Sequence, residues 1–413
     1  MIHRSAENNF HVEDARILRH QFLKGSVPGR LFVFAAAVVV GAMVAPQAQP
    51  QTPARAATTP NRVVTSKAKS TAKSTSTAKK TAPKAVARSP WKSPNYADSA
   101  AGDFVEGDDV VARRAAVSAL GRLNGSIVVA DADTGRVLTI VNQKTAYKEG
   151  FQPCSTIKIP VALAALSESV VDRLTQIRLY GNTKMAMTEA LAKSSNQYFA
   201  SLGEKLGFQK VSYYARLFGL GEKASLNIDE ETPGILPSET PRSGMGMMTS
   251  FGDGITITPL EMAGLVGAVA NGGTLYYLQY PKSQEEADTL LPRVKRRLDI
   301  EHLVRDIRPG MMGAVEYGTA RRIGFEAETP IYGKTGTCTD TRTPTHLGWF
   351  GSFTEIGHDR VVVVVLLTGG SAASGPSAAG VAGQVYKNLI AENYYSHERR
   401  AEPPLRASTV LAK

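Results

Sequence analysis

A serine and a lysine three positions apart, Ser155 and Lys158, are the first residues whose types and spacing fit covalent catalysis. On a helix, positions i and i+3 share a face, so the hydroxyl and the amine would lie within hydrogen-bonding reach. A neutral lysine accepts the proton of an attacking serine, and the isoleucines flanking this lysine lower its pKa toward the neutral state. The alternative is an ordinary helical turn, because the same spacing recurs in a low-complexity region, for example at Ser66 and Lys69.

Two later segments hold polar residues of the kinds that assist such a nucleophile. Ser194 and Asn196 lie in the stretch ALAKSSNQYF, and the run Lys334-Thr335-Gly336-Thr337 follows much later. A hydroxyl that both donates and accepts suits a proton relay, whereas an amine with neighbouring hydroxyls suits a carboxylate. Taken singly, each segment also has a structural interpretation, since serine and asparagine commonly cap helices and the lysine run fits a turn.

These residues need a scaffold, and the hydrophobic periodicity predicts one of mixed type. A hairpin is expected over residues 126–142, with its turn at Asp133-Thr134-Gly135. Strand-like runs are expected over 329–338, 346–355 and 360–370, and helices over 108–123, 161–171, 187–207, 258–273, 304–319 and 380–395. Residues 279–300 are charged and predicted to be irregular, and Trp349 and Phe350 are assigned to the core of a sheet. Strands near both ends of this region imply an antiparallel sheet that joins distant parts of the sequence.

The positive charge of the chain is concentrated before this region. Residues 51–100 hold ten Lys or Arg and one acidic residue, and with residues 1–50 they account for the formal net charge of +11. The basic stretch alternates lysine with Ala, Ser, Thr and Pro and has few aromatic residues to stack on bases. We therefore interpret it as an extended tether and expect no nucleic acid partner.

An apolar run from Leu31 to Ala45 follows a basic leader, which predicts that the N-terminus is cytoplasmic and that this run lies in the cell (inner) membrane. The catalytic part would then be periplasmic or extracellular. A retained single-pass anchor is favoured over a cleaved signal, because no clean small-x-small cleavage site follows. The predicted organisation is a leader (1–30), an anchor or signal segment (31–48), a linker (49–100), a globular domain (101–396) and a flexible tail (397–413). Neither the two cysteines nor the seven histidines have metal-ligand spacing, so no metal or cofactor is expected.

The three motifs, in this order, resemble the active-site signature of the penicillin-binding proteins and serine β-lactamases. The stretches ITPLEMAGLVGAVANGGT, MMGAVEYGTA and GWFGSF also resemble parts of the penicillin-binding transpeptidase domain, and together the similar stretches cover most of residues 126–390. The resemblance implies an α+β fold with an antiparallel β-sheet flanked by helices and an all-helical subdomain. It also implies an enzyme that cross-links peptidoglycan stem peptides ending in D-alanyl-D-alanine and is acylated by β-lactam antibiotics.

The resemblance assigns roles residue by residue. Ser155 is the implied nucleophile, Lys158 its base, and Ser194 the relay to the leaving group. Asn196 would hold the substrate amide, while Lys334, Thr335 and Thr337 would receive the terminal carboxylate. The backbone N–H groups of Ser155 and Thr337 would form the oxyanion hole, and Gly336 would leave room for a substrate along the strand.

The two cysteines directly flank these motifs, Cys154 before the nucleophile and Cys338 after Thr337. Since the two motifs face each other in the family, the resemblance allows a disulfide between them, and an exported domain permits oxidation. The alternative is two small, reduced core residues.

Several functions stay open at the level of sequence. STIKIP also resembles class D β-lactamases, although Asn196 and Thr337 are more typical of transpeptidases, and no acidic deacylating base is assigned. A D,D-carboxypeptidase and a non-catalytic penicillin-binding sensor are further alternatives. With no room predicted for a glycosyltransferase domain, a transpeptidase of this kind would depend on separate glycan-polymerising proteins.

Overall fold

The valine-rich segment Asp359–Gly369 forms β9, the central strand of a five-stranded sheet in the computed structural model. The structure describes residues 93–395 except 149, 325, 327, 341–343 and 357–358, and all of them belong to the unit Pro83–Lys413. The predicted leader, apolar segment and tail lie outside the described residues, as does nearly all of the linker. Among the residues that are described, no helix has the length and apolar character needed to span a membrane.

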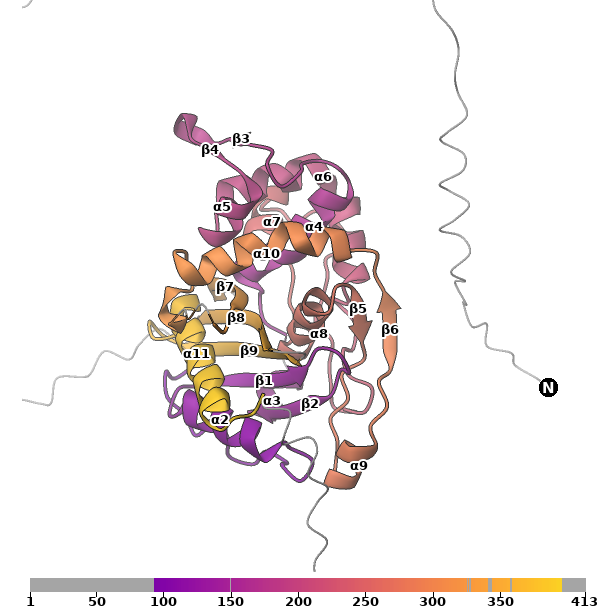
Figure 1. The fold of residues 1–413 in the computed structure, drawn as a ribbon. Coiled ribbons are helices and arrows are strands. Elements are labelled where there is room, and N and C mark those ends of the chain that lie inside the picture. The colour runs from indigo at the N-terminus through magenta and orange to yellow at the C-terminus, as the bar shows by residue number, and fades with distance from the viewer. Residues whose placement is uncertain are drawn as a thin grey trace, which may run out of the picture. The chain divides into compact units, whose positions relative to one another are not determined.

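Every neighbouring pair of strands in this sheet is antiparallel. From edge to edge the strands are β2 (Val137–Val141), β1 (Gly125–Asp131), β9, β8 (Thr345–Ile356) and β7 (Ile331–Asp340). The predicted hairpin and the three predicted strand runs are therefore confirmed. Because β1 pairs with β9, the beginning and the end of the domain lie side by side, as Figure 1 shows.

Both faces of the sheet are covered, which explains why β9 is apolar at successive positions. Val363 and Val365 pack in one core with α2 (Val110–Leu120) and α11 (Gly375–Ala391). Val362 and Val364 face the other core, which includes α8 (Pro259–Ala270). The capping box of Thr258 and Glu261 begins α8, and every residue of this helix is buried.

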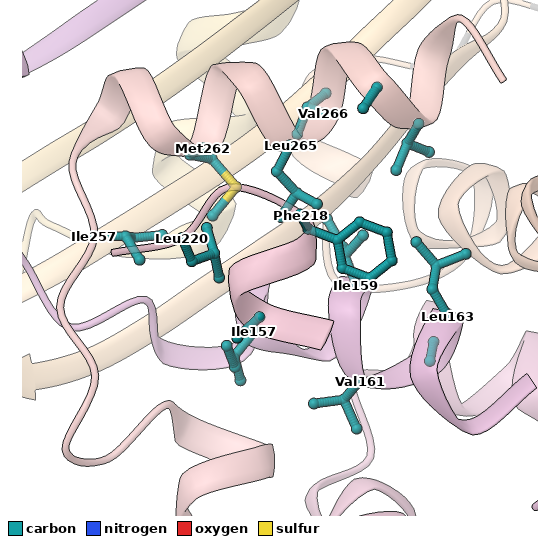
Figure 2. Close-up of a cluster of buried hydrophobic side chains, with 14 of the residues drawn as sticks. Ile157, Ile159, Val161, Leu163, Phe218, Leu220, Ile257, Met262, Leu265 and Val266 are labelled. Carbon is teal, nitrogen blue, oxygen red and sulfur yellow. The ribbon is translucent and has the colours of Figure 1, made fainter. Parts of the chain in front are cut away.

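An all-helical part packs on this second face, which confirms the predicted fold class. Figure 1 shows these helices gathered beyond the β7 edge of the sheet. They are α4 (Lys158–Ser167), α5 (Met187–Ala192), α6 (Asn196–Leu217), α7 (Met245–Phe251) and α10 (Glu301–Glu316). Figure 2 shows how the second core holds α4: Ile159 and Leu163 from this helix lie among side chains such as Phe218 and Leu265.

The prediction for residues 279–300 was wrong in part. This segment contains helix α9 (Gln284–Thr289) and strand β6 (Val294–Arg297), which pairs with β5 (Thr274–Tyr276). The strand VKRR has one hydrophobic residue in four, so its sequence carries no period-two pattern, and pairing with β5 determines its structure. The remaining elements are short: α3 (Gln143–Lys148), β3 (Ile177–Arg178), β4 (Lys184–Met185) and 3-10 turns at Cys154–Ile157, Tyr180–Asn182 and Arg321–Ile323.

Candidate active site

The serine–lysine pair lies where the 3-10 turn Cys154–Ile157 runs into α4. Both side chains are buried, and Lys158 Nζ is 2.7 Å from Ser155 Oγ. Ser155 Oγ also lies 3.4 Å from the carbonyl oxygen of Ser250, to which it donates. A buried helix start thus holds the amine against the hydroxyl, which is the geometry that a serine nucleophile and its base require.

Ser194 and Asn196 come to the same amine from the connection between α5 and α6. Ser194 has a left-handed backbone with φ of 56°, and Lys158 Nζ is 3.2 Å from its Oγ and 2.6 Å from Asn196 Oδ1. The cap of α6 is the intervening Ser195, whose hydroxyl accepts from the N–H of Tyr198. The capping interpretation therefore applies to Ser195 and leaves its two neighbours turned toward Lys158.

Lys334 approaches Ser194 from β7, the edge strand of the sheet. Its side chain is fully buried, and Nζ donates to Ser194 Oγ at 2.8 Å and to the Thr335 carbonyl at 2.9 Å. The sheet and the helical part therefore meet at the Ser194 hydroxyl, which lies within hydrogen-bonding distance of the amines of both Lys158 and Lys334. This forms a continuous chain of polar atoms from Ser155 through Lys158 and Ser194 to Lys334.

Burial lowers the pKa of both amines. For Lys158 burial alone lowers the pKa to about 7, so a large fraction is neutral near neutral pH. For Lys334 burial lowers the pKa well below its usual value, and repulsion from Lys158 lowers it further. The burial of Lys158 at the start of α4 therefore accounts for the lowered pKa of this amine.

The two threonines of β7 point away from these lysines. Thr335 Oγ1 is 2.5 Å from Thr319 Oγ1, and Thr337 Oγ1 accepts from the N–H of Gly375 at the start of α11. Thr337 is exposed and Thr335 is buried. Thr319 was not among the predicted site residues, although it lies in the stretch MMGAVEYGTA that carried part of the resemblance. Only the tertiary pairing of its hydroxyl with Thr335 brings it to the site.

Gly336 is required by the packing of β7 against the turn that carries the nucleophile. A Cβ at this position would lie 2.9 Å from the Pro153 carbonyl oxygen and 3.2 Å from both Thr156 Cγ2 and Trp349 Cβ. The missing side chain therefore lets β7 approach the turn that carries the nucleophile, and the room for a substrate along the strand stays a prediction. A bulkier residue would push the strand and the turn apart.

A disulfide joins the same two elements. Cys154 and Cys338 are bonded, with their Cα atoms 5.5 Å apart and a separation of 184 positions in the sequence. Of the two alternatives, the structure thus shows the disulfide rather than two reduced cysteines, and the described residues contain no free cysteine. Cys154 itself has a left-handed backbone with φ of 52°. Within the described ranges, no group of three or more His, Cys, Asp or Glu residues is placed to hold a metal ion.

At this site the edge of the sheet and the helical part bring two serines and two lysines together. This arrangement is typical of a serine acyltransferase or hydrolase. The profile of the penicillin binding protein transpeptidase domain matches residues 125–390. The chain belongs to this family, because the match covers well over half of its length.

Named relatives agree with the family. The chain is 27% identical over 286 residues to stage V sporulation protein D of Bacillus subtilis, covering 62% of this chain and 44% of that protein. It is 28% identical over 272 residues to the peptidoglycan D,D-transpeptidase PbpA of Mycobacterium tuberculosis, covering 57% of this chain and 54% of the relative. It is 27% identical over 251 residues to the peptidoglycan D,D-transpeptidase FtsI of Escherichia coli K12, covering 49% of this chain and 42% of that protein. The chain thus spans about half the length of these relatives.

A solved structure supports the fold. Penicillin-binding protein A from M. tuberculosis, described as a ceftriaxone acyl-enzyme complex, superposes with a TM-score of 0.58 at 21% identity. The superposition covers 69% of this chain and 79% of the other. At this identity the similarity establishes the shared architecture of sheet and helices.

Proposed function

We propose that this chain is a serine D,D-transpeptidase that cross-links peptidoglycan stem peptides and is acylated by β-lactams. The observation that carries the proposal is the buried Lys158 amine, 2.7 Å from Ser155 Oγ and 3.2 Å from Ser194 Oγ. The family match and the names of the relatives support the same reaction class.

In the proposed acylation, Ser155 Oγ attacks the carbonyl carbon of the penultimate D-alanine while neutral Lys158 accepts the hydroxyl proton. The backbone N–H groups of Ser155 and Thr337 stabilise the oxyanion that forms. When the C–N bond breaks, Ser194 passes a proton to the leaving D-alanine amine and is reprotonated by Lys158. The product is an ester at Ser155 and free D-alanine, with the amine of Lys158 neutral again.

The substrate carboxylate is proposed to bind beside β7. Lys334, Thr335 and Thr337 lie in one run of this strand, and Thr337 is exposed to an incoming ligand. Asn196 Oδ1 accepts from Lys158, so its amide N–H groups remain as donors for a substrate carbonyl. Lys334 contributes a donor to Ser194 as well, which couples carboxylate binding to the proton relay.

An amine acceptor is favoured over water by the surroundings of Lys158. Within the described part of the chain its hydrogen-bond partners are Ser155, Ser194 and Asn196, none of which is a carboxylate that would activate water for deacylation. This supports a long-lived ester that an amine resolves, and it disfavours fast hydrolysis through a carboxylate base.

The proposal includes a location. The apolar segment 31–48 would hold the chain in the cell membrane by a single pass, and the linker 49–100 would carry the catalytic domain to the peptidoglycan. Cross-linking needs glycan strands, which we propose come from separate glycan-polymerising proteins.

The test uses the full-length chain in detergent with a fluorescent penicillin. Wild type should acquire one stable label, and Ser155→Ala should acquire none while keeping its melting temperature. Label that forms and then decays within minutes would show that the protein is a β-lactamase. Label on the alanine variant would show that another residue is the nucleophile.

The hydroxyl of Thr319 should matter for binding more than for chemistry. In Thr319→Val the Thr335 hydroxyl loses its partner, so it is less well oriented for a carboxylate, at a cost of about 1 kcal/mol. We expect the dissociation constant of the initial penicillin complex to rise about fivefold, with the acylation step changed less than twofold. Thr319→Ser, which keeps the hydroxyl, is the control. Equal binding by the valine and serine variants would contradict this role.

A further inference from the structure

Trp349 reaches from the sheet to the turn that carries the nucleophile. It lies on β8 directly opposite Gly336 of β7, and its side chain is fully buried. Its indole Nε1–H donates to the Gln152 carbonyl at 2.9 Å, three residues before Ser155 and 197 residues away in sequence. The assignment of Trp349 to the sheet core is therefore confirmed, and its polar atom has a specific partner as well.

The turn that receives this bond depends on contacts from outside. Its backbone is left-handed at Cys154, a conformation that costs free energy for any residue except glycine. Before the turn, Phe151 exchanges two backbone hydrogen bonds with Ile257, and its ring meets the Trp349 ring edge-on, with centroids 6.5 Å apart. Within the turn, Thr156 Oγ1 donates to the Pro153 carbonyl at 2.6 Å.

Trp349 also touches the strand proposed to bind substrate. A Cβ at Gly336 would lie 3.2 Å from Trp349 Cβ and 2.9 Å from the Pro153 carbonyl oxygen, so β7 approaches both the tryptophan and the residue before the turn closely. The indole bond to Gln152, together with the disulfide, therefore helps to set the height of the turn relative to β7. Since the proposed oxyanion donors are one N–H from each element, this spacing decides whether they converge on one oxygen atom.

We propose that Trp349 is a positioning residue for acylation, acting through its hydrogen bond to the Gln152 carbonyl. This inference rests on the proposed function. Without the bond, the partly buried Gln152 carbonyl loses its indole donor and the turn can shift. A displacement well below 1 Å is enough to misalign the Ser155 hydroxyl and N–H with the carbonyl under attack. Initial binding along β7 depends less on the turn, so the covalent step should suffer most.

The experiment compares Trp349→Phe with Phe353→Leu in the full-length chain. Phe353 lies on the same face of β8 and is equally buried, but its ring stacks on Tyr332 rather than on the turn. Stopped-flow acylation by a fluorescent penicillin separates the initial dissociation constant from the acylation rate constant. Trp349→Phe should lower the rate constant about 10- to 100-fold, with the dissociation constant within about threefold of wild type. Phe353→Leu should lower the melting temperature while keeping the rate constant within threefold.

A second variant removes only the donor. 3-Benzothienylalanine at position 349 keeps the bicyclic shape but has sulfur in place of the N–H, so folding should be preserved even if Trp349→Phe unfolds. It should slow acylation as the phenylalanine variant does. Acylation at the wild-type rate by the benzothienyl protein would overturn the inference and leave the proposed function standing. Failure of wild type itself to be labelled at Ser155 would instead overturn the proposed function.

Discussion

Lys158→Met should lower the rate of penicillin acylation by about 10³-fold, because general-base catalysis contributes about 10²- to 10⁴-fold and Lys158 is the amine within hydrogen-bonding distance of Ser155 Oγ. Methionine is unbranched and fits the buried space that the lysine stem occupies at the start of α4. The fold should therefore persist, with an unchanged or higher melting temperature, since no amine has to be desolvated. Stopped-flow labelling together with thermal unfolding measures both quantities.

The same amine predicts the pH dependence of wild type. Burial lowers the pKa of Lys158 to about 7, and only the neutral form accepts a proton. The acylation rate should therefore rise with pH through about 7 and reach a plateau above it, because deprotonation creates the base. In Lys158→Met this rise should disappear. A variant that acylates within tenfold of wild type, or that keeps the same rise, would contradict the assignment of Lys158 as the base.

Removing the disulfide should cause the largest loss of stability. The variant with both Cys154→Ala and Cys338→Ala frees a link across 184 residues, and a native disulfide contributes about 2–4 kcal/mol by restricting the unfolded chain. We expect the melting temperature to fall by roughly 5–10 °C. Acylation should slow by about tenfold as the turn and β7 separate, while Trp349 and Gly336 keep the two elements in contact.

The control for this prediction is the reduced wild type. Reductant should lower the melting temperature and acylation rate of wild type to those of the double variant, and it should leave the double variant unchanged. If reductant lowers both proteins equally, the effect does not come from this bond. If the double variant melts at the wild-type temperature, the disulfide does not stabilise the fold.

The sequence by itself determined the type of fold and the order of the motifs. The short apolar runs within 126–142 and the apolar run at 360–370 specify strands, because side chains in a strand alternate between faces and this sheet is covered on both. The spacing of Ser155 and Lys158 likewise specified a shared helical turn, since that contact is local.

Only the tertiary structure decided the contacts between residues that are far apart in sequence. Nothing local shows that Ser195 rather than its neighbours caps α6, that Gly336 makes room for Pro153, or that Thr319 meets Thr335. Local sequence likewise does not show that β6 pairs with β5 or that Trp349 bonds to Gln152. The physical reason is that local periodicity encodes which face of an element is buried, whereas the identity of the partner across that face depends on how the whole chain packs.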